Sequence, residues 1–188
     1  MSPSIFITLL LVTGPYSVST GELRQIVATS TKHYAEAGIK LKVKRIYKIR
    51  DRYANLETIS EAERKFWLYR SFVRRVGYGG KGRTHAILPP MLELHGYRYL
   101  GGFAEGSCNG RFSLSNAQAL RHNSDPTTNG SESITMSGIA FSHELGHTLN
   151  AEHNDKVPNI MHSAALQFTG QPIGFLASTI YRMRRCVK

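Results

Sequence analysis

The most constraining feature of the sequence is a short segment in which His143 and His147 are four residues apart and His153 follows six residues later. If the first two lie on a helix, they share one face, and both imidazoles can reach one ion from the same side. Imidazole nitrogens bind zinc well, at about 2.0–2.1 Å. Glu144 adjoins the first ligand, where it can take a proton from metal-activated water without entering the coordination shell. The spacing therefore predicts a helix that carries a metal site and a general base.

The third histidine requires a break in this helix. Six residues of continued helix would turn His153 by about 600°, well away from the face of the other two. A sharp ending needs a residue that tolerates the left-handed conformation, for which glycine is best and asparagine is next. Asn150 stands at that point. The HExxH pattern alone is only moderately specific, and a third histidine at a fixed place cuts chance matches roughly 24-fold.

The N-terminal region contains an apolar run, Ile5–Val12, which is too short to span a membrane. Pro3 and the Gly14–Pro15 pair bound it, as expected of a buried first strand. The alternative is the core of a signal peptide with a cleavage point soon after it, which would make the protein secreted, although no Lys or Arg precedes the run. We favour the strand.

The rest of the chain predicts alternating helices and strands. A strand–helix–strand order at the start normally joins two parallel strands through a right-handed crossover. Serine or threonine caps, glycine stops and apolar periodicity set the expected bounds. The expected strands are Ile5–Val12, Ile39–Lys44, His85–Leu88 and Tyr97–Ala104, and the expected helices are Thr20–Ala37, Ser60–Val76, Ile134–Leu149 and Ile173–Arg185.

Length and composition restrict the class of protein. A chain of 188 residues with 41% hydrophobic residues can bury the core of one domain. The formal charge of +11 is compatible with an anionic glycan or surface as partner, but no nucleic-acid motif accompanies it, and a solvated basic surface is the preferred interpretation. No later segment is long and apolar enough to be transmembrane. The two cysteines, Cys108 and Cys186, can form one bridge or remain free thiols.

The sequence around the histidines resembles the metzincin metallopeptidases, whose pattern is HExxHxxGxxH followed by a turn that contains methionine. Four of the five fixed positions match, namely His143, Glu144, His147 and His153. Asn150 replaces the glycine, and Met161 looks like the methionine of the turn. The resemblance implies an α/β (α+β) fold: a single two-lobed catalytic domain over residues 1–188, with an upper lobe of about 1–150 and a lower lobe of about 151–188. This domain has a twisted, mostly parallel sheet, an active-site helix and a C-terminal helix. It also implies one catalytic Zn²⁺ ion and an endopeptidase in which Glu144 is the general base.

Within the metzincins, Gly102–Cys108 looks like the edge-strand segment of the adamalysin (reprolysin) branch. In that branch a cysteine there is bonded to one at the end of the C-terminal helix, which implies a Cys108–Cys186 disulfide. Two positions depart from known branches: Asn154 stands where adamalysins have aspartate, and Ser163 where some other branches have tyrosine.

A protein or peptide substrate is expected to add as a strand along the edge of the sheet. The residues expected beside it are Gly101, Gly102, Phe103 and Ala104. The protein is expected to be a monomer.

Two other functions are compatible with the sequence. One is a zinc-stabilised binding domain without turnover, against which Glu144 argues because metal binding alone does not need it. The other is a basic glycan- or nucleic-acid-binding protein whose HExxH pattern is accidental. Binding of a glycan or nucleic acid by such a protein would weaken steeply as the salt concentration rises.

Overall fold

The computed structural model describes residues 2–14, 17–51, 59–75, 82–88, 102–116, 130–163, 165 and 172–187. Within them the chain forms a mixed α/β fold with a five-stranded sheet. The strands are β1 (Ser4–Thr13), β2 (Lys40–Arg50), β3 (Arg83–Leu88), β4 (Gly102–Ala104) and β5 (Phe112–Asn116). The helices are α1 (Thr20–Glu36), α2 (Ile59–Arg75), α3 (Gly130–His147) and α4 (Ala177–Cys186).

The sheet has the order β2-β1-β3-β5-β4. All neighbouring strands are parallel except β4 and β5, which are antiparallel. The expectation of a mostly parallel sheet is therefore confirmed. The apolar run at the N-terminus is β1, which lies between β2 and β3 in the sheet, so the strand interpretation of that run is confirmed.

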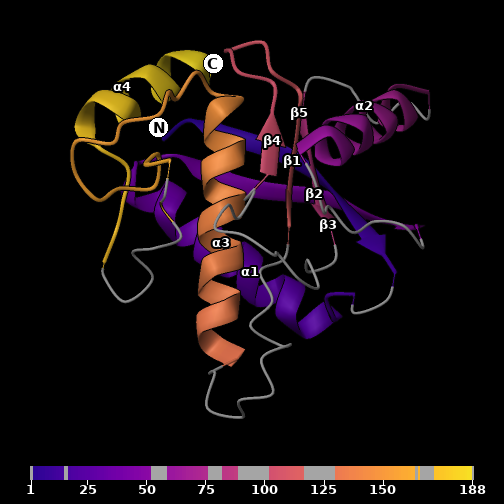
Figure 1. Cartoon of the computed structure of the whole chain (residues 1–188). Coiled ribbons are helices and arrows are strands. Elements are labelled where there is room, and N and C mark those ends of the chain that lie inside the picture. Colours follow the sequence, from indigo (N-terminus) through magenta and orange to yellow (C-terminus); the bar gives the residue numbers. More distant parts are fainter. Residues whose placement is uncertain are drawn as a thin grey trace.

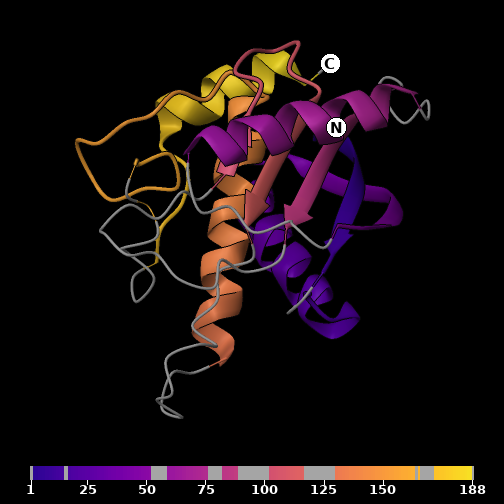
Figure 2. The ribbon, with the colours of Figure 1, turned by 45° about the vertical axis from the view of Figure 1, so that its right-hand side comes forward.

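The residues of β1 alternate between two hydrophobic cores, because successive side chains of a strand point to opposite faces. Ile7 and Leu9 lie in the core shared with α1 and α3. Leu10 and Val12 lie in a smaller core beneath α2. Helices thus cover both faces of the sheet: α3 crosses one face, and α2 crosses the other (Figures 1 and 2).

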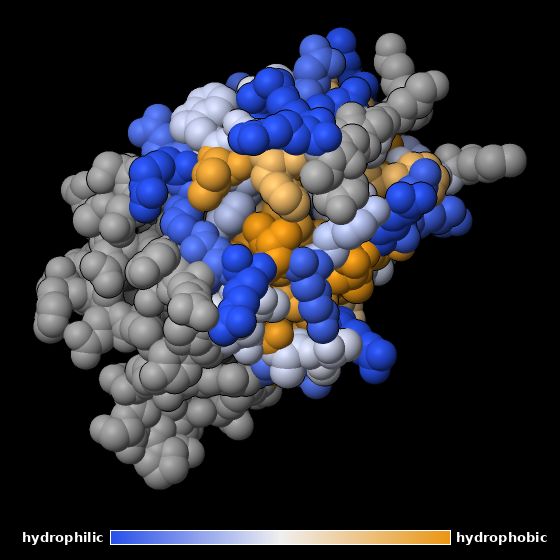
Figure 3. Space-filling view, turned by 90° about the vertical axis from the view of Figure 1, so that its right-hand side faces the viewer, coloured by the Kyte–Doolittle hydropathy of each residue, from blue (hydrophilic) through white to orange (hydrophobic). Residues whose placement is uncertain are grey.

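Helix α2 is amphipathic, and part of its apolar surface is left uncovered. Trp67, Leu68 and Phe72 are exposed, and the side of the molecule that carries α2 mixes apolar and hydrophilic residues (Figure 3). None of the described helices is long and apolar enough to cross a membrane.

Several element bounds differ from those expected. The C-terminal helix begins at Ala177, not at Ile173, because the extended segment before it pairs with the turn after the histidines through the bond from Ile160 N to Gly174 O (3.1 Å). Strand β2 continues to Arg50, beyond Lys44. Helix α3 begins four residues earlier than expected, at Gly130, and its regular part ends at His147, not at Leu149. Of the strand expected at 97–104, residues 97–101 lie outside the described part.

Candidate metal centre

Asn150 ends the metal-site helix as the sequence predicts. Its φ is 64°, and it is the only non-glycine residue with positive φ among those described. The amide of Ala151 turns back to donate to the carbonyl of Gly146 (3.1 Å), and the amide of Asn150 donates to His147 O (3.0 Å). These bonds satisfy carbonyls that a helix end would otherwise leave unpaired, and they redirect the chain toward the helix face.

The break brings the three histidines together. Their Nε2 atoms form a nearly equilateral triangle, with distances of 3.0 Å between His143 and His153, 3.1 Å between His143 and His147, and 3.2 Å between His147 and His153. The three residues are a group able to hold a metal ion.

Hydrogen bonds on the far side of two rings fix which nitrogen faces inward. Nδ1 of His143 donates to the carbonyl of Ile160 (2.7 Å), and Nδ1 of His147 donates to the carbonyl of Ala151 (2.7 Å). A carbonyl can only accept, so each Nδ1 carries the proton and each Nε2 presents a lone pair. Lone pairs about 3 Å apart repel one another unless a cation lies between them. Such outer bonds are also the usual support of metal-binding histidines.

The triangle has the size that zinc requires. Zinc lies about 2.0–2.1 Å from a histidine nitrogen, and three nitrogens about 3 Å apart could all hold one ion at that distance. Burial lowers the pKa of His143 to about 3 and also lowers the pKa of His147. Both imidazoles are therefore neutral at ordinary pH, which is the form that binds metal. The donor set and its charge state thus fit Zn²⁺.

Glu144 lies beside the first histidine and is only 6% exposed. Burial raises the pKa of its carboxyl to about 8 in the protein without a cation, since little around it compensates the charge. A divalent ion nearby would favour the carboxylate and lower that pKa. Glu144 is therefore a buried carboxyl whose protonation would respond to a metal ion held by the histidines.

The edge strand along which a substrate is expected to bind, β4, lies close to Glu144. Strand β4 is an edge of the sheet and contacts α3. A Cβ built on Gly102 would lie 2.7 Å from Cγ of Glu144, so only glycine lets the strand approach this closely. Phe103 and Ala104 complete β4, while Gly101 lies outside the described residues.

Met161 is fully buried in the turn that follows His153. Its Sδ would lie 2.9 Å from a Cβ at Gly146, so the sulfur packs directly against the helix between the two ligands. Asn159 closes this turn: its Oδ1 accepts from Met161 N (2.8 Å), and its Nδ2 donates to Asn154 O and Val157 O (both 2.7 Å). Asn159 was not predicted from the sequence, because no spacing rule marks such a residue.

A network of buried hydrogen bonds holds the metal-site helix against α1. No motif in the sequence predicted it. Ser142, which precedes the first ligand, donates to Gly138 O (2.8 Å) and contacts Ser30 Oγ and His33 Nδ1 (both 2.9 Å). Tyr34 OH donates to the carbonyl of Ser142 (3.0 Å). All of these groups are buried, so the network fixes the helix at the residue before its first histidine.

Cys108 and Cys186 form a disulfide with a Cα–Cα distance of 4.8 Å. The bond fastens the end of α4 to the segment between β4 and β5. Arg83 supports the same segment by donating to Cys108 O (3.1 Å) and Thr148 O (3.2 Å). The expected pairing is confirmed, and it ties the metal-site helix, the edge-strand segment and α4 into one body.

The fold is that of zinc-dependent peptidases. Metalloproteinase-II from Bacteroides fragilis superposes with a TM-score of 0.63 at 17% identity, over 99% of this chain and 53% of that protein, so the chain spans about half of it. Archaemetzincin from Methanopyrus kandleri gives 0.58 at 19% identity, over 97% and 94% of the two chains. A zinc-dependent peptidase from Methanocorpusculum labreanum gives 0.60 at 12% identity, over 94% and 99%. No family profile matches the sequence, and no curated protein is significantly similar to it.

Proposed function

We propose that this protein is a zinc-dependent endopeptidase of the metzincin type, with residues 1–188 forming one catalytic domain. The observation that carries the proposal is the convergence of three imidazole Nε2 atoms beside the buried carboxyl of Glu144. His143, His147 and His153 would hold the ion. Zinc bound there would supply a Lewis acid that polarises the scissile carbonyl and makes water acidic near neutral pH.

The chain's own residues then have distinct tasks. Glu144 accepts the proton of the attacking water and passes it to the leaving amine. Its burial supports this role, because a base works best when its pKa lies near the operating pH. The amides and carbonyls of Gly102, Phe103 and Ala104 align an extended peptide as an added strand. The close contact of Gly102 with Glu144 would bring that peptide beside the base.

The branch and location are further parts of the proposal. The position of Met161 supports the metzincin type, and the Cys108–Cys186 disulfide supports the adamalysin branch, while Asn154 and Ser163 depart from known patterns. A disulfide also favours an oxidising compartment, so we propose a secreted monomer. Its charge of +11 would favour anionic glycans or surfaces as secondary contacts.

Metal content and cleavage test the proposal together. The purified protein should contain one zinc per chain and cleave unstructured peptides, and it should lose both properties on chelation and regain both when zinc is returned. Protein that was never exposed to chelator yet holds no stoichiometric metal would contradict the proposal.

Glu144→Ala separates catalysis from metal binding. We expect it to keep zinc and the fold but to lose about 10²–10⁴ in rate, as is typical when a general base is removed. Peptide turnover and metal content measured on the same sample would test this. If the variant cleaves like the parent, Glu144 is not the base. If neither protein cleaves but both hold zinc, the site is a structural one.

A further inference from the structure

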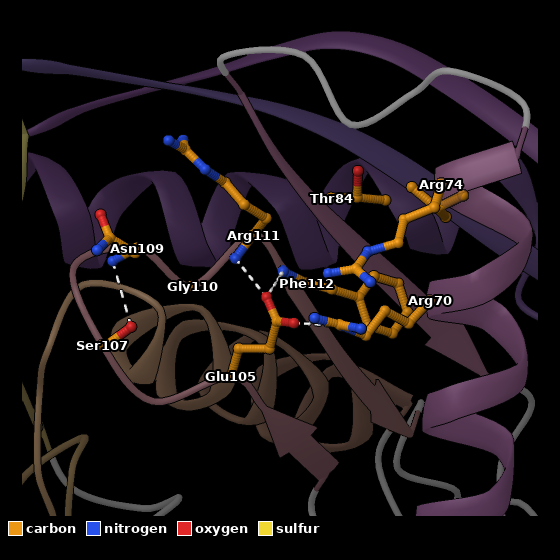
Figure 4. A pocket seen from close by; sticks show the side chains of 10 residues that line it. Arg70, Arg74, Thr84, Glu105, Ser107, Asn109, Gly110, Arg111 and Phe112 are labelled. Carbon is orange, nitrogen blue, oxygen red and sulfur yellow. Dashed lines mark hydrogen bonds and ion pairs between the residues drawn. The ribbon is translucent and has the colours of Figure 1, made fainter.

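A cavity of about 480 Å³ lies on the α2 side of the sheet, and its lining includes neither the three histidines nor Glu144. It is bounded by α2, by the first residues of β3 and β5, and by the segment that joins β4 to β5 (Figure 4). Three arginines and one carboxylate carry its charge: Arg70, Arg74, Arg111 and Glu105.

The single carboxylate is already fully engaged. Glu105 forms an ion pair with Arg70 through one oxygen, and its other oxygen accepts from the amides of Arg111 (2.7 Å) and Phe112 (3.2 Å). Partial burial alone would raise its pKa, but these amides and Arg70 hold the pKa of Glu105 below its usual range. Glu105 therefore stays ionised and balances Arg70, which leaves no carboxylate of the lining for a second guanidinium.

Arg74 is that second guanidinium. It lies one helical turn after Arg70, and both side chains extend from α2 into the cavity (Figure 4). Among the described residues, no carboxylate pairs with Arg74. An anion in the cavity would balance the charge of Arg74, which Glu105 leaves uncompensated because it pairs with Arg70.

The helix dipole does not explain this arrangement. Arg74 and Arg75 both lie in the last turn of α2, where cations are favourable. The dipole acts on both residues alike, yet only Arg74 lines the cavity. Arg75 is exposed, as Arg74 is, but it lies outside the cavity lining, so it provides a matched control.

The far wall of the cavity is fixed in place. The segment 105–111 is held by the disulfide at Cys108, by Arg83 on the Cys108 carbonyl and by a turn from Gly110 N to Ser107 O (2.9 Å). Gly110 packs so closely on Glu105 and Thr148 that a Cβ would not fit there. A wall with these restraints is preorganised, so a ligand would not have to order it.

We propose that this cavity binds a sugar-sized molecule that carries a phosphate or sulfate ester. Guanidinium groups match the oxygens of such esters with paired, charge-assisted hydrogen bonds. The polar side chains of Ser107 and Asn109 also line the cavity, so donors surround the ester on more than one side. The volume lies in the range of small-molecule sites, about 300–1,000 Å³, which is more than a free oxyanion needs.

Calorimetric titration tests the proposal, with glucose 6-phosphate and glucosamine 6-sulfate as probes and inorganic phosphate and sulfate for comparison. We expect saturable binding of at least one sugar ester, and weaker binding of the inorganic ion. Arg74→Gln should raise the Kd at least about tenfold, as expected for the loss of a charged hydrogen-bond donor, whereas Arg75→Gln should change it less than about twofold. Asn109→Asp, which adds a negative charge to the exposed rim, should also weaken binding strongly.

Three outcomes would overturn the proposal. Absence of saturable binding of every probe would exclude the site. Equal weakening by Arg74→Gln and Arg75→Gln would assign the binding to general surface charge. An inorganic ion that binds as tightly as its sugar ester would exclude the sugar as part of the ligand. Thermal unfolding of each variant confirms that the fold is kept, and none of these measurements depends on the metal site.

Discussion

Asn150 decides where His153 lies, because the chain reverses at its left-handed backbone. A β-branched residue is strained at positive φ, whereas glycine is not. We expect Asn150→Gly to be nearly neutral for zinc affinity and stability. Asn150→Val should destabilise the protein by about 1–3 kcal/mol and weaken zinc binding. Zinc competition with a chromophoric chelator measures the affinity, and equal affinities for the two variants would contradict the role given to this residue.

Gly102 limits how close the edge strand can come to Glu144. A methyl group at this position would collide with Glu144 and with the carbonyl of Leu114, so β4 or the carboxyl must move. A displacement near 1 Å can cost about 10² in rate. Gly102→Ala should therefore lower peptide turnover strongly while zinc content stays at one per chain.

Gly106 provides the control for this substitution. It lies four residues further along, and a Cβ there would meet nothing within 4 Å. Gly106→Ala should cleave peptides like the parent. If the two variants have the same turnover, β4 does not position the substrate or the base.

At the level of elements, the disulfide connects parts that are 78 residues apart in sequence. It holds α4 against the segment after β4, and Arg184 adds a hydrogen bond to Ala37 O at the end of α1 (3.0 Å). Closing so long a loop stabilises a domain by about 2–4 kcal/mol. The free energy of unfolding of the double variant Cys108→Ser, Cys186→Ser, measured in urea, should be lower by that amount. Reduced wild-type protein should lose the same amount, and no loss in either would show that the bond does not stabilise the domain.

How well the elements could be predicted depended on whether local rules decide their ends. Ser19 forms a capping box with Glu22, and Gly38 has a φ of 69°, so α1 was predictable within a residue. The start of α4 was not, because its N-cap residue, Leu176, has no side chain that can cap a helix and so gives no signal in the sequence. Ile173 and Phe175 come before this residue. Both are buried in an extended segment whose backbone pairs with Ile160, and only the folded chain brings these partners together.

The metal ligands of the site were predictable, because the spacing of the histidines along the chain determines where they meet. The three histidines meet because a helix and one left-handed residue fix their directions. The partners that orient them are main-chain carbonyls, which any residue supplies, so the sequence gives no sign of the bonds to Ile160 and Ala151. The arginine-lined cavity was also invisible, since it joins α2 to a segment 30 or more residues away.

At the scale of the whole molecule, buried histidines make stability depend on pH. His85, in β3, is fully buried between Ser113 Oγ (2.7 Å) and Ser115 Oγ (2.9 Å) and stacks on Phe141. Burial lowers its pKa to about 3 from an ordinary value of 6.5. Between these two pH values the unfolded chain binds a proton at this residue and the folded chain does not. The contribution to stability is therefore complete above pH 6.5 and is lost as the pH falls toward 3, by about 1.4 kcal/mol per pH unit.

His85→Gln isolates this contribution. The variant will be less stable overall, because the substitution disturbs two buried hydrogen bonds, but its stability should fall less steeply between pH 6 and pH 5. The two slopes should differ by about 1.4 kcal/mol per pH unit. Urea unfolding of both proteins in the presence of chelator measures them. His143 titrates in the same direction as His85, and Glu144, whose pKa is raised, titrates in the opposite direction. Both groups are present in the two proteins, so their effects cancel in the difference, and equal slopes would mean that His85 is not held neutral in the folded chain.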